Sequence, residues 1–171
     1  MENTKKIIIG ILASSLVMAS GVAEARSGVI KARGSNGGVT AVKGPNGGGA
    51  VRARGTRQNA DGSVTRASGG AYRTRNGGTS VRGSSTTVNP DGSATRNSGY
   101  AANGQRGSVN SDSSVTRDAN GNWSGGRNTS ATNAATGNSY QGSTMIDPTT
   151  GKPVHSGSCF DASGSAIACP R

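Results

Sequence analysis

Turn-forming dipeptides recur at a fixed spacing in this chain, and that spacing constrains the fold more than any other feature. They begin fifteen residues apart: Asn46-Gly47, Asp61-Gly62, Asn76-Gly77 and Asp91-Gly92. Asn-Gly and Asp-Gly accept the positive φ that a tight turn requires. The segment Asp61–Arg66 returns thirty residues later as Asp91–Arg96, and in altered form as Asp112–Arg117. The chain is therefore expected to build its fold from short, similar units.

The stretches between these turns alternate with a period of two residues. In Val51-Arg52-Ala53-Arg54 the apolar and basic side chains alternate, as they do on the two faces of a strand. Glycine interrupts nearly every window that is long enough for a helix. The expected fold is mostly β, with a large irregular or disordered fraction. Short strands would form an antiparallel meander of ~15/30-residue repeats, and a β-solenoid is the alternative.

Large apolar residues are too scarce for a conventional core. Aromatic residues make up 3% of the chain, whereas glycine alone contributes 29 residues. Burial of so little apolar surface does not offset the conformational entropy lost on folding. The chain is expected either to stay largely disordered or to gain order from stacking, from a partner or from self-assembly.

The first 25 residues have the pattern of a secretory signal peptide. Lys5 and Lys6 precede an apolar run over residues 7–18, which is too short for a permanent membrane span, and Ala23-Glu24-Ala25 is a small-x-small cleavage site. We expect a cleaved signal helix over 1–25 and no integral membrane segment after cleavage. The mature protein would then be found in the periplasm, at the cell surface or outside the cell.

Composition divides the remainder into three parts. Residues 26–45 are expected to be a flexible glycine-rich lead-in, 46–140 a tandem Gly/Ser/Asn/Arg repeat region, and 141–171 a C-terminal hairpin. The two cysteines, Cys159 and Cys169, both lie in the last part, and in an exported chain they are expected to form a disulfide. Phe160 and Ile167 are expected to pack across this hairpin.

The charge of the chain is one-sided. The net charge is +11, and no Glu follows residue 25. Arg66, Arg96 and Arg117 share one position in the three related segments, so stacked units would align them in a column that binds a polyanion. Further arginines are candidates for the same role: Arg52, Arg82, Arg73 and Arg75. Expected partners are lipopolysaccharide, nucleic acid or acidic polysaccharide. The alternative interpretation is that the positive charge serves only to keep the chain soluble.

Each unit also carries one large ring next to arginine: Tyr72, Tyr100 and Trp123. Such rings stack on sugars or bases. The other interpretation, which the sequence favours, is that each ring is the only large side chain that its unit has to bury.

No pattern in the chain indicates catalysis or a cofactor. The single histidine, His155, is expected in an exposed loop beside the disulfide, and each turn holds a single Asp, whereas calcium loops cluster several carboxylates. We expect no metal and no cofactor. The expected function is that of an exported, non-enzymatic structural or adhesive protein at the bacterial surface or in extracellular matrix. A polyanion-binding module is the alternative, and an enzyme is the least favoured class.

Overall fold

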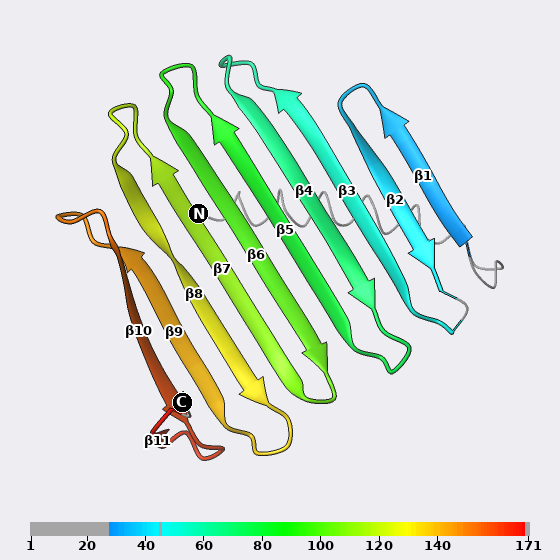
Figure 1. The fold of residues 1–171 in the computed structure, drawn as a ribbon, viewed down its shortest axis with the longest axis vertical. Coiled ribbons are helices and arrows are strands. Elements are labelled where there is room, and N and C mark those ends of the chain that lie inside the picture. Colours follow the sequence, from blue (N-terminus) through cyan, green and yellow to red (C-terminus); the bar gives the residue numbers. More distant parts are fainter. Residues whose placement is uncertain (1–27, 45, 170–171) are drawn as a thin grey trace.

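A computed structural model describes residues 28–44 and 46–169, which form one open antiparallel sheet. Its eleven strands follow one another across the sheet in chain order, so every strand pairs only with its neighbours in the sequence (Figure 1). The expected signal peptide lies outside the described residues. None of the described residues belongs to a helix that is long and apolar enough to cross a membrane.

The strands are longest in the middle of the sheet. The first five are β1 (Gly28–Gly34), β2 (Gly37–Lys43), β3 (Gly49–Gln58), β4 (Val64–Arg73) and β5 (Thr79–Val88). The remaining six are β6 (Ala94–Gly104), β7 (Gly107–Arg117), β8 (Trp123–Asn133), β9 (Ser139–Ile146), β10 (Pro153–Phe160) and β11 (Ala166–Ile167).

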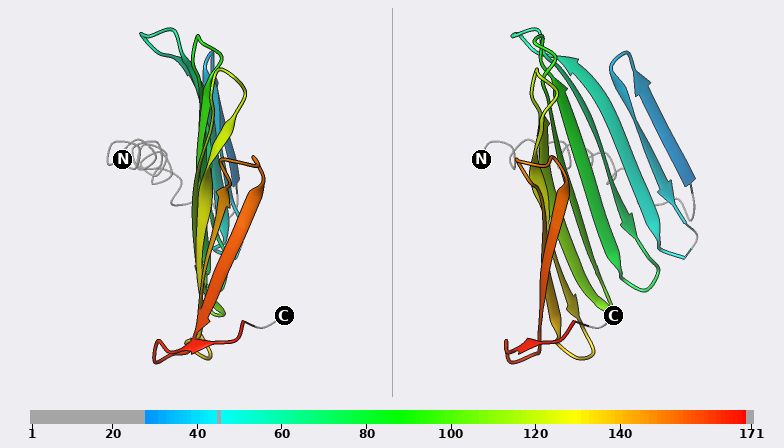
Figure 2. Two further views of the ribbon diagram at one scale, coloured as in Figure 1. Left: turned by 90° about the vertical axis from the view of Figure 1, so that its left-hand side faces the viewer. Right: turned by 60° about the vertical axis from the view of Figure 1, so that its left-hand side comes forward.

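The sheet is a single layer, as the edge-on view in Figure 2 shows, and no other part of the described chain covers either of its faces. Among the described residues only Ser63, Ser111 and Cys159 are buried. Their exposed fractions are 1%, 5% and 7%, and none of them is a large apolar residue. The described residues therefore fold without a hydrophobic core of their own, as the composition indicated.

The β class and the antiparallel meander are confirmed, and the solenoid alternative is wrong for these residues. The strands are longer than expected, because β3 to β8 each run for ten or eleven residues. Glycines lie directly opposite one another within these strands, as Gly69, Gly83 and Gly99 do, and the ladder runs through them. A large irregular fraction is therefore absent from the described residues.

The stretch expected to be a flexible lead-in contains the hairpin β1–β2, which is paired from Gly28 opposite Lys43 to Gly34 opposite Gly37. Its edge strand β1 carries Lys31 and Arg33, which discourage pairing with a further strand.

The turns at Asp61-Gly62 and Asp91-Gly92 have the same geometry. In the first, Gly62 has a φ of 82° and its N–H donates to the Asn59 carbonyl, while the Asn59 N–H donates to the Ser63 carbonyl. Positive φ is the reason that glycine is needed at this position. The second turn makes the same two hydrogen bonds around Gly92, at a φ of 83°. Both turns end strands at the same end of the sheet (Figure 1).

Candidate polyanion-binding face

The pairing register sorts the basic side chains onto one face of the sheet. Directly opposed residues in neighbouring strands share a face, and successive residues along a strand alternate between faces. We call the face that holds most of the basic residues the basic face. Its members are Lys31, Arg33, Arg52, Arg54, Arg66, Arg82, Arg96, Arg117 and Arg127. The other face, which we call the small-residue face, has basic side chains only near strand ends: Lys43, Arg57 and Arg73.

Uncharged residues separate the arginines across the strands. Thr86 lies between Arg66 and Arg96, and Gly70 lies between Arg52 and Arg82. Two strand spacings place each such pair about 9.6 Å apart at the backbone. Like charges directly opposite each other would destabilise the sheet. At this spacing, which is about one Debye length in 0.1 M salt, the positive field is retained at a smaller cost in repulsion.

The three aromatic rings lie on the basic face among these arginines. Tyr100 is directly opposite Arg82, and Trp123 is directly opposite Arg117. Tyr72 lies on the same face in β4. The rings are 39%, 54% and 52% exposed for Tyr100, Trp123 and Tyr72, so none of them serves as a buried core residue. The interpretation that each ring is buried within its own unit is therefore wrong, and the rings are available to a ligand.

The basic face is hollowed over β1 to β6. A broad, shallow basin of about 970 Å³ is lined by five arginines, namely Arg33, Arg52, Arg54, Arg66 and Arg96. Hydroxyl groups of Ser68, Ser84 and Thr86 form its floor between the arginines. A basin so open to solvent suits an extended polymer better than an enclosed small molecule.

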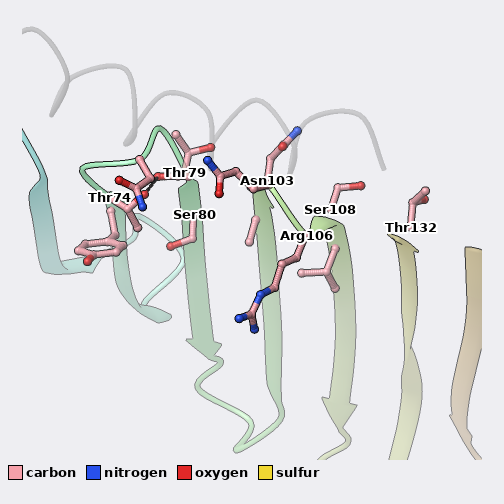
Figure 3. A pocket seen from close by; sticks show the side chains of 15 residues that line it. Thr74, Thr79, Ser80, Asn103, Arg106, Ser108 and Thr132 are labelled. Carbon is pink, nitrogen blue, oxygen red and sulfur yellow. Dashed lines mark hydrogen bonds between the residues drawn. The ribbon is translucent and has the colours of Figure 1, made fainter. Parts of the chain in front are cut away.

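A second hollow of about 480 Å³ lies near one end of the strands (Figure 3). Tyr72 and Arg106 both line it, and Arg106 extends from the tight turn between β6 and β7 back along the strands. The backbone carbonyl of Arg106 accepts a hydrogen bond of 3.0 Å from the Ala134 N–H, which ties this turn to the one after β8. This hollow therefore combines a cation with an exposed ring.

The structure brings together only some of the arginines that the sequence predicted to bind a polyanion. Arg66 and Arg96 share a row across the sheet, but Arg117 lies opposite Ala94, two residues further along. In the third segment Asp112 lies within β7 and not in a turn, so this segment runs in the opposite direction to the other two and Arg117 falls at the end of its strand. Arg73 lies on the small-residue face, and Arg75 lies in the turn between β4 and β5.

Sequence reasoning missed four residues of the basic face, namely Lys31, Arg33, Arg54 and Arg127, and it also missed Arg106 in the turn between β6 and β7. The alternation in Val51–Arg54 placed Arg54 on the same face as Arg52, because residues two apart in a strand share a face. Arg54 could therefore have been predicted as a member of the basic face. The others depend on the register between strands, which no single strand reveals.

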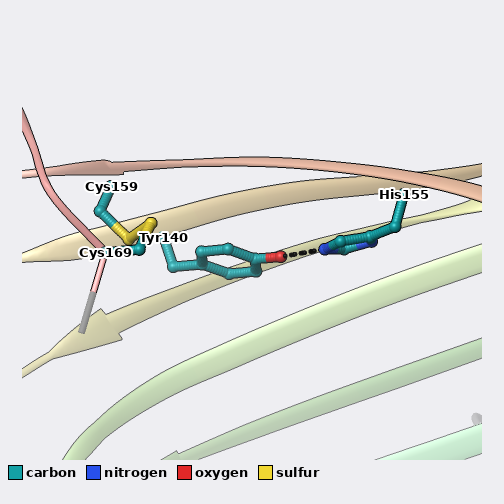
Figure 4. The surroundings of a disulfide bond; sticks show 4 residues. All are labelled: Tyr140, His155, Cys159 and Cys169. Carbon is teal, nitrogen blue, oxygen red and sulfur yellow. Dashed lines mark hydrogen bonds between the residues drawn. A yellow bond between two sulfur atoms is a disulfide. The ribbon is translucent and has the colours of Figure 1, made fainter. Parts of the chain in front are cut away.

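A small polar cluster lies beside the disulfide at the other edge of the sheet (Figure 4). The Tyr140 hydroxyl is 3.0 Å from His155 Nε2, and the Thr144 hydroxyl is 2.9 Å from His155 Nδ1. His155 is exposed as expected, but it lies in β10 and not in a loop. The Tyr140 ring covers Gly142 and Gly157, whose missing side chains leave room for it. Cys159 is bonded to Cys169, so no free thiol accompanies this histidine.

The turn carboxylates are engaged by their own turns. The Ser63 hydroxyl donates to Asp61 Oδ1 at 2.7 Å and the Ser63 N–H donates to the same oxygen at 2.9 Å, which lowers the pKa of Asp61. The same pair of donors on Ser93 lowers the pKa of Asp91. Within the part of the chain that the structure describes, no three His, Cys, Asp or Glu side chains gather into a group suited to a metal ion.

Comparison with protein-family models, with curated proteins and with solved structures gives no match to this chain, so its function has to be argued from the chemistry of its faces.

Proposed function

We propose that this protein is an exported, non-enzymatic binder of anionic polymers, which lie across the basic face. The observation that carries the proposal is the segregation of the strand cations, together with exposed aromatic rings, on one side of the sheet. A chain that needed charge only for solubility has no reason to sort it by face. Cations that follow a backbone of negative charges, combined with rings that stack on bases or sugars, are the recurring features of single-stranded nucleic-acid binding.

The polymer would make two kinds of contact. The arginines of the basin would pair with phosphate or carboxylate groups, and guanidinium groups bind such oxygens in a bidentate manner. Tyr100 and Trp123 would stack on flat groups of the ligand beside Arg82 and Arg117. Nucleic acid, lipopolysaccharide and acidic polysaccharide all supply the anionic groups, and only nucleic acid supplies bases for the rings.

The test is a salt titration of binding with two matched variants. Arg66→Gln with Arg96→Gln removes two charges from the basic face, whereas Arg57→Gln with Arg73→Gln removes two exposed charges from the other face. Binding of labelled oligo-dT and of heparin is measured by fluorescence anisotropy over a range of NaCl concentrations. For oligo-dT, the first variant is expected to reduce the slope of log K against log salt by about 1.4, because each lost phosphate contact contributes about 0.7.

The control variant is expected to keep the slope of the parent protein. Equal losses in the two variants would show that only the net charge matters, and the assignment of binding to one face would then be wrong. Loss of oligo-dT binding with heparin binding intact in a Trp123→Ala variant would identify nucleic acid as the polymer that the rings serve.

A structural role in surface or matrix material is the second candidate. It is favoured by the open apolar rows of the small-residue face, which none of the described residues covers.

A further inference from the structure

The small-residue face carries two adjacent rows with complementary relief. One row consists of Ile30, Ala41, Val51, Ala71, Val81 and Ala101, which are directly opposed across β1 to β6. The next row on this face consists of Ala32, Val39, Ala53, Gly69, Gly83 and Gly99. Across β3 to β6 the first row is a ridge of Val and Ala, and the second is a trench that ends in three glycines.

The ridge is exposed to solvent although it is the most continuous apolar feature of the sheet. Ile30 is 46% exposed and Val81 is 37% exposed. An apolar groove of about 570 Å³ runs along this row and is lined by Ile30, Val51, Ala71 and Val81. Two stacked sheets pack about 10 Å apart, and small side chains permit a closer approach. A sheet face of this kind is therefore incomplete without a second layer.

We propose that the second layer is another copy of this chain, packed face to face through the small-residue face. The twofold axis lies in the interface between the two sheets. It runs across the strands, parallel to the ridge and the trench and midway between them. Rotation about this axis places the ridge of each copy on the trench of the other. Val81 then lies over the partner's Gly83, and the partner's Val81 lies over Gly83. The same operation places Ala71 over the partner's Gly69 and Ala101 over the partner's Gly99. This reciprocal arrangement is what a twofold interface requires.

Charge also selects a second copy in this orientation. The cations of this face lie near strand ends, and the same axis places Arg73 opposite the partner's Ala67, Lys43 opposite the partner's Gly37 and Arg57 opposite the partner's Gly47. No cation of this face therefore lies directly opposite a like charge across the interface. The basic faces, in contrast, would repel each other, so they remain on the outside of the pair.

The area is sufficient for a stable dimer. Six strands at about 4.8 Å spacing and eight residues at about 3.4 Å rise give a patch on the order of 800 Å². A standard specific interface buries about 800 Å² on each partner. The small-residue face of β1 to β6, with the ridge and trench at its centre, reaches this size without any contribution from the polar half of the face over β7 to β10.

The experiment compares neighbouring residues that point to opposite faces. Val81→Lys places a charge on the ridge, whereas Ser80→Lys places the same charge on the basic face one residue away. Sedimentation equilibrium of the full mature chain is expected to show a dimer for the parent and for Ser80→Lys, and a monomer for Val81→Lys. Circular dichroism checks that each variant keeps its β signal.

A second variant separates loss of the interface from loss of folding. A Cβ added at Gly99 would meet only the Ser111 carbonyl, at 3.9 Å, so Gly99→Val is accommodated within one chain and raises β propensity. It fills the trench, and it is expected to weaken dimerisation at least tenfold while the melting temperature of the isolated chain is kept. Two results would overturn the proposal. One is a parent protein that stays monomeric at a concentration on the order of 100 µM. The other is a dimer that neither variant weakens.

The outcome is independent of polymer binding. The double variant at Arg66 and Arg96 is expected to remain dimeric, and Val81→Lys is expected to keep its affinity for a short oligonucleotide that spans one basic face. Failure of one property therefore does not imply failure of the other.

Discussion

At the scale of single residues, the turn carboxylates connect the stability of the sheet to pH. Asp61 and Asp91 each accept a serine hydroxyl and a serine N–H, and these donors lower the pKa of both carboxyls in the folded chain. A group whose pKa is lowered by folding stabilises the native state above its unfolded value of 3.8. That contribution is lost as the pH falls from about 4 through the lower folded values.

We predict that the hydroxyl groups of Ser63 and Ser93 control part of the acid sensitivity of the folded chain. The free energy of unfolding, measured by urea titration, is expected to be constant from pH 7 to 5 and to fall as the pH is lowered from 4 to 2. Ser63→Ala with Ser93→Ala is expected to reduce this fall, because the folded pKa values move back toward 3.8. A double variant with the acid sensitivity of the parent would show that these hydrogen bonds do not control it.

At the scale of the element, the disulfide closes one edge of the sheet. Cys159 and Cys169 are ten residues apart with a Cα–Cα distance of 5.2 Å, and they tie the two-residue strand β11 to the end of β10. Closure of a loop of this size stabilises a chain by roughly 2–3 kcal/mol in the chain-entropy model. The effect should stay local, because β10 and β11 pair with nothing beyond β9.

The disulfide is removed by reduction or by the double substitution Cys159→Ser with Cys169→Ser. We expect the rate of hydrogen exchange in β11 and at the end of β10 to rise by one to two orders of magnitude. This rise corresponds to a decrease of roughly 2–3 kcal/mol in the free energy of local opening. Exchange in β3 to β8 is expected to stay unchanged. Hydrogen-exchange mass spectrometry gives both results in one measurement. Faster exchange throughout the sheet would mean that the whole fold depends on this edge.

The same hairpin shows where prediction from sequence ends. The disulfide and the turn at Asp161 were predictable from composition and spacing. Phe160 and Ile167, however, do not pack across the hairpin, because Cys159 is paired with Ile167 and Phe160 with Ala166. A shift of one residue in register moves a side chain to the opposite face. The turn residues locate a hairpin, but its register also depends on the loop length, which the sequence left open here.

The basic face was predictable to a similar extent. Alternation within one strand placed Arg52 and Arg54 together, and the related segments linked Arg66 with Arg96. Arg127 and Arg33 could be assigned to that face only once every intervening strand had been paired. To assign every side chain of an eleven-stranded sheet to a face, ten registers have to be predicted correctly in succession. An error of one residue in any of them exchanges the two faces for all the strands beyond it.

At the scale of the whole molecule, the two faces together predict a cross-linking activity. A face-to-face dimer has its basic faces outward on opposite sides, so it can hold two polymer chains at once. Long heparin or DNA mixed with the parent protein is expected to form large particles, as measured by light scattering. Val81→Lys is expected to bind without forming them, and high salt is expected to dissolve them. Particles that form equally well with the monomeric variant would show that one face is enough to bridge.

The connections between strands have a consequence for how such a chain can change in length. Because every strand pairs only with its neighbours in the sequence, gain or loss of a whole hairpin leaves all the other registers as they were. Each added hairpin would widen the sheet by about 9.6 Å and enlarge both faces in proportion. Duplication and deletion within the gene can thus adjust the width of both faces in equal steps, with no new fold required.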